Sequence, residues 1–268
     1  MGHPERRVRA GALPLGLALM LASGCAVPTA SSPQSLAASP SGSTVQASPS
    51  TAVPSLMPTP SADPVLSALA ATRSRGTARV ALELMTAAPD VERTLLGEGV
   101  VDFARGATDL SWSSVAGDSR EVRTEEGFFV EVEEGQWLAV DPGRSTPTSE
   151  AGDVLRSLDE LREPVVEGSE SVGGVSATRI TGWLPASRGD EENVAGLGLT
   201  DAELVTVADA GTARIRLAIW IDDSGRIIQV VRTLVDVESI SATSIARLSA
   251  FGVAAPITVP SSIAATAR

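Results

Sequence analysis

Hydrophobic and polar residues alternate with a period of two along much of the chain beyond residue 76. This pattern predicts β-strands that bury one face and expose the other. The clearest pair spans 213–221 and 227–237, joined by the turn sequence Asp222-Asp223-Ser224-Gly225. Weaker alternation predicts further strands over 77–86, 99–106, 109–113, 128–133, 137–140, 165–170, 175–183 and 243–251. Most neighbouring strands are joined by short turns, which requires antiparallel pairing.

Three other segments space their apolar residues three or four apart, which predicts helices. They span about 65–75, 154–161 and 200–210. The first is preceded by Asp63 and Pro64, an N-cap residue and a first-turn proline. The third begins at Thr200 with Glu203 three residues later, which is the spacing of a capping box.

The order of these elements predicts an α+β fold class. An antiparallel sheet of about nine to eleven strands curls rather than staying flat. One face of the sheet is apolar and needs a cover, which the helices can supply. We therefore expect a strongly curved antiparallel sheet, a half-barrel, with helices packed on its concave face.

The first 25 residues have the three parts of an export signal. Arg6, Arg7 and Arg9 give a positive start, and an apolar stretch of 12 residues follows, too short for a membrane-spanning helix. Small residues then precede Cys25, the only cysteine. This order resembles a bacterial lipobox, which predicts a signal peptide over 1–24 and a diacylglyceryl-modified Cys25. The alternative is an ordinary signal peptide followed by a chance cysteine.

The segment 25–64 is rich in Pro, Ser, Ala and Thr and carries one charged residue, Asp63. Such a composition buries too little apolar surface to fold, so we expect a disordered tether. The remaining 65–268 contains no second linker and is expected to be one domain. With two acyl chains on Cys25, the protein is expected to be exported and anchored to the outer face of the cytoplasmic membrane.

The composition excludes most catalytic chemistry. The chain has 21 Arg and no Lys or Tyr, and its single histidine, His3, lies in the predicted signal peptide. The body beyond Cys25 therefore cannot form a Ser-His-Asp or Cys-His triad, a Cys/His zinc site or a lysine Schiff base. The acidic turn at 222–225 lacks the further ligands of a calcium loop. We expect no enzyme activity, no catalytic residue, no metal and no cofactor, and the net charge of −12 argues against nucleic acid.

Several short stretches carry a resemblance to a known family. They are Gly99-Val-Val-Asp-Phe103, Glu134-Gly-Gln-Trp-Leu138, Glu167-Gly168 through Gly174-Val-Ser-Ala-Thr-Arg179, Ile219-Trp-Ile-Asp-Asp-Ser-Gly-Arg226, and Phe251-Gly through Ile257-Thr-Val-Pro260. Together with the lipobox, they are similar to the LppX/LprG lipoproteins of the actinobacterial cell envelope, whose fold is like that of LolA. The resemblance implies a hydrophobic cavity between sheet and helices that binds and carries lipid or glycolipid.

Two hypotheses follow for function. The first is a monomeric, membrane-anchored carrier of lipid or glycolipid, which could pass its ligand to an envelope transporter. The second is an interaction or regulatory module on the same fold without a lipid ligand. For the first, the residues expected to line the cavity are Val80, Leu82, Val101, Phe103, Leu110, Trp112, Phe128, Val130, Leu155, Leu158, Ile215, Leu217 and Ile219. Ordinary core packing is the alternative for each of them.

Overall fold

A computed structural model describes residues 63–140, 148, 150–186, 191–194, 196–254 and 256–264. The predicted signal peptide, Cys25 and most of the predicted tether lie outside the described residues. The elements, in chain order, are α1 (Pro64–Arg73), β1 (Thr77–Ala88), β2 (Val91–Asp102), β3 (Ala107–Ser114), β4 (Gly117–Thr124), β5 (Gly127–Glu133), β6 (Gln136–Val140), the 3₁₀ turn η1 (Leu158–Glu160), β7 (Arg162–Val172), β8 (Val175–Pro185), α2 (Glu191–Val194), α3 (Asp201–Ala210), β9 (Arg214–Asp222), β10 (Ile227–Val235), β11 (Ser241–Ser249) and β12 (Ile263–Ala264).

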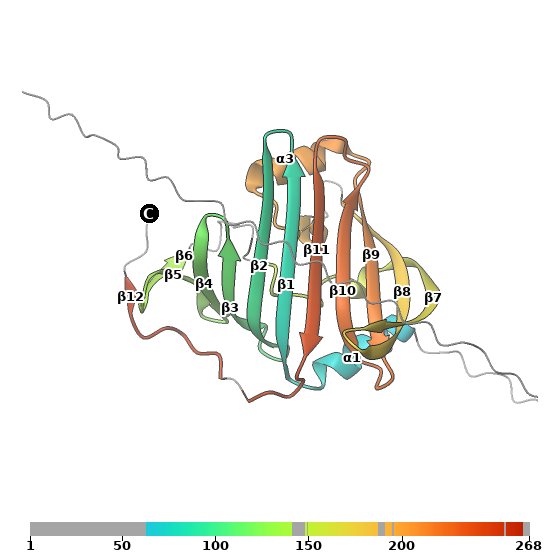
Figure 1. The fold of residues 1–268 in the computed structure, drawn as a ribbon, viewed down its shortest axis with the longest axis horizontal. Helices are drawn as coiled ribbons and strands as arrows, with labels where there is room; N and C mark the ends of the chain where they lie inside the picture. Colours follow the sequence, from blue (N-terminus) through green and yellow to red (C-terminus); the bar gives the residue numbers. More distant parts are fainter. Residues whose placement is uncertain are drawn as a thin grey trace, which may run out of the picture. The chain divides into compact units, whose positions relative to one another are not determined.

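All the strands form one sheet, in the order β12-β6-β5-β4-β3-β2-β1-β11-β10-β9-β8-β7. Strands β1 to β11 pair antiparallel with their neighbours, and the two-residue β12 pairs parallel with β6. Figure 1 shows these strands side by side, with α3 across one end and α1 at the other. The sheet is open and curved, and the helices pack on its concave side, as the sequence predicts.

The period-two pattern has the expected physical meaning. Along β1 and β11, buried and more exposed residues alternate strictly over most of each strand. Most of the buried apolar residues of β1, β9, β10 and β11 form one core with those of α1, α3 and the segment before α3. We call the sheet face that carries this core the inner face, and the opposite face the outer face.

Local capping explains where the helices begin. The Asp63 carboxylate accepts hydrogen bonds from the backbone N–H of Val65 (2.8 Å) and of Leu66 (3.4 Å), with Pro64 in the first turn. Thr200 and Glu203 form the complete capping box of α3, so this prediction is confirmed. Arg93 of β2 donates to the same Glu203 carboxylate at 2.5 Å, which ties α3 to the sheet.

The structure differs from the predicted elements at three places. No α-helix spans 154–161, where the chain forms turns and η1. Ser157 has a φ of +57°, a left-handed conformation that an α-helix cannot contain. Strand β4 was not predicted, because its charged and small residues hide the alternation, and β2 begins at Val91 rather than at residue 99.

The C-terminal segment after β11 crosses the outer face. Its Ile257 is buried in a second apolar cluster with Val122, Phe129 and Trp137, and Val259 packs against the same cluster. Figure 1 shows this segment running from the end of β11 to β12 beside β6. The outer face of β3 to β6 is therefore partly covered. No helix among the described residues is long and apolar enough to cross a membrane.

Candidate functional site

The predicted lining residues lie on the inner face, and most of them are packed into the core. Ten have at most 4% of their surface exposed and belong to one core cluster. Eight of these ten do not line the inner cavity described below: Val80, Leu82, Leu110, Trp112, Leu158, Ile215, Leu217 and Ile219. Side chains therefore fill most of the space between sheet and helices. At these eight positions the structure shows core packing.

A pair of residues on β2 and β3 shows how the interior is filled. Gly97 faces Trp112 across the two strands. A Cβ atom at Gly97 would lie 2.6 Å from Cζ3 of the Trp112 ring, so the ring rests directly on the glycine backbone. The absence of a side chain at position 97 lets the largest residue of this sheet region lie flat inside the fold. The indole takes up volume that a ligand could otherwise use.

The same indole is held by a buried carboxylate. Trp112 Nε1 donates to Glu121 Oε2 at 2.9 Å, and the Thr148 hydroxyl donates to Glu121 Oε1. Glu121 is only 6% exposed. Burial raises the pKa of Glu121 above its ordinary value, although the two hydrogen bonds act in the opposite direction. Sequence analysis did not identify Glu121, because a lone Glu in a charged segment is usually solvated.

A cavity of about 400 Å³ lies on the inner side. It lies between β2–β4, the end of α1 and the segment 150–157. Three predicted residues, Val101, Phe103 and Leu155, form part of its wall. Its volume lies within the range of about 300–1,000 Å³ that is usual for small-molecule sites, near the lower end.

The rim of this cavity is polar and includes three charged side chains besides Asp102. Arg73 lies in the last turn of α1 and is exposed, and it forms no ion pair within the described part of the chain. Arg123 of β4 is paired with Glu150 at 2.9 Å, and Asp153 is paired with Arg156 at 3.0 Å. An amphiphile in the cavity would thus meet an apolar wall and an arginine without an ion pair at the opening.

The segment 150–157 is fixed to the sheet by a buried arginine. Arg232 of β10 is 6% exposed and donates to the backbone carbonyls of Val154 (3.1 Å) and Arg156 (3.0 Å). Burial lowers the pKa of Arg232 to about 10. These hydrogen bonds hold the segment 150–157, which forms one wall of the cavity, against the sheet. The segment forms turns where the sequence predicts a helix.

The last two predicted residues, Phe128 and Val130 of β5, also face inward but are only half-buried. They do not line the cavity. Sequence reasoning missed Arg73, Thr108, Arg123 and Gly152, which do. The sequence around these four residues does not indicate a shared site, because they lie on separate segments that meet only in the folded chain, beside the turns of 150–157. No group of acidic, histidine or cysteine residues in the described part of the chain could hold a metal ion.

Comparisons with known proteins give matches among solved structures only. No protein-family model matches the chain, and no curated protein matches it significantly. LppX of Mycobacterium tuberculosis is similar over 73% of this chain and 96% of LppX, with 16% identity and a TM-score of 0.49. LprF of Mycobacterium bovis is similar over 74% of this chain and 95% of LprF, with 14% identity and a TM-score of 0.48.

A LolA superfamily protein of Nitrosomonas europaea is similar over 73% of this chain and 96% of that protein, with 10% identity and a TM-score of 0.33. The solved structures thus include the family and the fold to which the sequence shows a resemblance. At these identities and scores the likeness concerns the fold alone.

Proposed function

We propose that this protein is a non-catalytic lipoprotein of the cell envelope that binds and carries a lipid or glycolipid through one of its acyl chains. The supporting observation is the cavity beside 150–157, which combines an apolar wall at Val101, Phe103 and Leu155 with Arg73 at its rim. Each CH₂ group that enters the cavity contributes about 0.8 kcal/mol. An acidic headgroup would remain at the rim, where Arg73 can pair with it.

The size of the cavity limits the ligand. At about 400 Å³ it suits a single acyl chain better than a lipid with two long chains. Buried core residues occupy most of the rest of the inner face. A ligand with one inserted chain and a second chain outside is the arrangement that fits the geometry.

Binding can be tested with a fluorescent fatty acid and the full chain carrying Cys25→Ala, which cannot be acylated. Arg73→Glu places a negative charge at the rim and is expected to weaken binding about tenfold, since one charge-assisted contact is lost and a repulsion is added. Arg75→Glu, also exposed but outside the cavity, is the matched control and should change binding little. Equal effects of the two variants would contradict the proposed rim contact.

A second variant tests the apolar wall. Leu155→Trp fills the cavity and is expected to abolish probe binding, whereas Val205→Trp, exposed on α3, should leave it unchanged. Circular dichroism checks that both variants fold. Mass spectrometry of organic extracts of the full chain identifies any lipid that co-purifies. Absence of co-purified lipid together with no binding of the fatty acid would refute the carrier function.

The membrane anchor is a separate part of the proposal. Cys25→Ala is expected to move the protein from the membrane fraction to the soluble fraction, because two acyl chains are required for stable anchoring. Ser31→Ala in the tether is the matched control and should remain in the membrane fraction. Unchanged membrane retention of the cysteine variant would contradict the lipid anchor without bearing on the cavity.

A further inference from the structure

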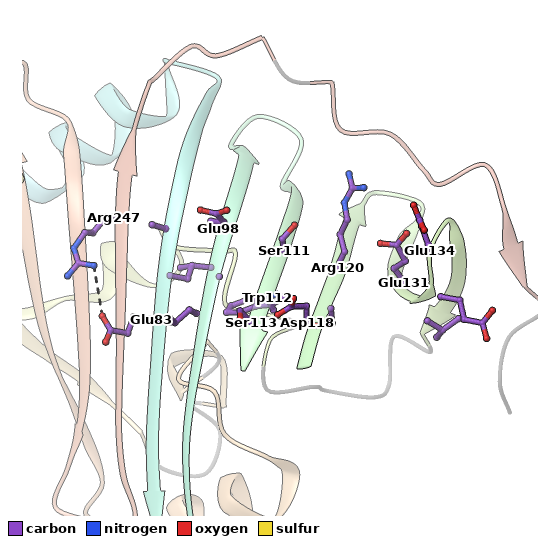
Figure 2. A pocket seen from close by; sticks show the side chains of 17 residues that line it. Glu83, Glu98, Ser111, Trp112, Ser113, Asp118, Arg120, Glu131, Glu134 and Arg247 are labelled. Atoms are coloured by element: carbon purple, nitrogen blue, oxygen red, sulfur yellow. Dashed lines mark ion pairs between the residues drawn. The ribbon is translucent and has the colours of Figure 1, made fainter. Parts of the chain in front are cut away.

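A second hollow lies on the outer face, opposite the helices. This outer groove has a volume of about 810 Å³ and is lined by residues of β1 to β5 and β11, with Glu134 just beyond β5. Figure 2 shows its side chains lying across the strands, from Arg247 and Glu83 at one end to Glu131 and Glu134 at the other. The lipid-binding proposal does not use this groove.

Strand register explains why the surface is hollow there. Ala81 lies opposite Glu98, Glu98 opposite Ser111, and Ser111 opposite Arg120, so one row crosses four strands. Ala81 and Ser111 are small and leave space between their longer neighbours. Along the strands, the next row includes Val122 of the cluster that the C-terminal segment covers. The groove is therefore the uncovered part of this face.

The charges that line the groove are unbalanced. Six carboxylates and two guanidinium groups give it a net charge of −4; the acidic residues are Glu83, Glu98, Asp118, Glu131, Glu133 and Glu134. Both arginines have partners already. Arg120 donates to Asp109 at 3.0 and 2.8 Å, and Arg247 donates to Gln229 at 3.1 Å.

Several of the carboxylates have no such partner. Within the described part of the chain, Glu98, Asp118 and Glu133 form no hydrogen bond or ion pair through their side chains. Two apolar side chains, Leu96 and Val132, also line the groove and are 52% and 55% exposed. An occupant that matches this surface needs several positive charges together with apolar groups.

The length of the groove indicates what kind of molecule fits. From β11 to β5 it crosses five strand spacings of about 4.8 Å, or roughly 24 Å. An extended polypeptide covers this distance with about seven residues at 3.3 Å each. A simple polyamine could neutralise the carboxylates but has no side chain to place on Leu96 and Val132.

We propose that the outer groove binds an extended, basic segment of a partner polypeptide. Its Arg or Lys side chains pair with Glu98, Asp118 and Glu133, and its apolar side chains contact Leu96 and Val132. The inner cavity is thus left for a lipid while a protein partner occupies the other face. The groove would allow the chain to recognise a partner without giving up its ligand.

The test uses a fluorescently labelled peptide of alternating arginine and leucine, with the full chain carrying Cys25→Ala. We expect saturable binding that weakens as NaCl is raised. The double variant Glu98→Gln/Asp118→Asn should bind roughly tenfold more weakly, since two ion pairs of ordinary surface strength are lost. The matched control is Glu92→Gln/Glu238→Gln, which removes two exposed carboxylates outside the groove and should change affinity less than about twofold.

A neutral variant separates shape from charge. Ser111→Phe blocks the middle of the groove from an exposed position and should abolish binding without altering the net charge. Equal effects of the two double variants, or full binding by Ser111→Phe, would overturn the proposal. Spermine that competes for the groove as strongly as the peptide does would also overturn it, because the occupant would then be a polyamine rather than a polypeptide.

Discussion

Gly97→Ala adds a single methyl group inside the fold, beneath the Trp112 ring. The new Cβ would lie 2.6, 2.7 and 2.9 Å from ring atoms Cζ3, Cε3 and Cη2. The ring cannot easily move, because its Nε1 is bonded to the buried Glu121 at 2.9 Å. Overpacking of this kind lowers the free energy of unfolding by about 1–3 kcal/mol. Alanine is more stable than glycine in a strand by about 0.5–1 kcal/mol, which offsets part of this loss. The variant should therefore lose about 1–2 kcal/mol of the free energy of unfolding.

Urea unfolding followed by circular dichroism measures this loss, and a double-mutant cycle assigns its cause. Trp112→Leu removes the ring, so Gly97→Ala in that background should be neutral or slightly stabilising. The two substitutions should then show a coupling energy of about 1–2 kcal/mol. If Gly97→Ala is as stable as the parent chain, or if its cost is the same with and without Trp112, the interior is looser than the structure indicates.

Three further changes test other parts of the fold. Glu121→Gln should be more stable than the parent in mildly alkaline buffer, because the pKa of Glu121 is raised in the folded state and its neutral form, which favours folding, is lost as pH rises. Below pH 4.5 this difference in the free energy of unfolding should vanish in urea titrations. A difference that persists there would contradict the direction of the pKa shift. Arg232→Met leaves the carbonyls of Val154 and Arg156 without their donor. It should lower the free energy of unfolding by about 2 kcal/mol and reduce hydrogen-exchange protection in the segment 150–157. Unchanged protection would contradict the role assigned to Arg232. Thr200→Ala should lower stability by about 1 kcal/mol in thermal unfolding through loss of the cap, whereas Thr206→Ala, in the exposed middle of α3, should cost clearly less.

The sequence was most informative where one face of a strand is buried and the other is solvated. The predicted strands 213–221 and 227–237 match β9 and β10 to within two residues, since both segments are rich in β-branched and other apolar residues and are joined by a clear turn sequence. Strand β4 failed this test because Val122, on the outer face, is the only large apolar residue among charged neighbours. It is buried by the C-terminal segment, which is distant in sequence.

The helix predicted over 154–161 failed for a different reason. Its apolar residues have helical spacing, and Val154, Leu155 and Leu158 are indeed buried together. The backbone that carries them forms turns, however, and the carbonyls of Val154 and Arg156 accept hydrogen bonds from Arg232. Periodicity records which side chains face the core, and it cannot tell which backbone conformation carries them when a long-range donor is present.

The candidate site could be located only in part from the pattern. The alternation along the strands indicates which residues face inward, but it does not indicate the volume of any cavity between sheet and helices. Whether a side chain lines a cavity or fills it depends on its neighbours across the sheet. Trp112 fills its space because residue 97 is a glycine, whereas Val101 borders a cavity because the segment 150–157 stops short of it. Both outcomes follow from contacts between residues that are distant in sequence.

The two hollows place opposite demands on a ligand, and this makes the two proposals separable. The inner cavity combines an apolar wall with Arg73, whose side chain forms no ion pair among the described residues, and the proposed ligand is therefore an amphiphile with a negative headgroup. The outer groove has a net charge of −4 and repels such a ligand. A fatty acid probe and a basic peptide should therefore bind the same molecule at once, each unaffected by substitutions in the other site. Competition between the two probes would show that they share one site, and at least one of the assignments would then be wrong.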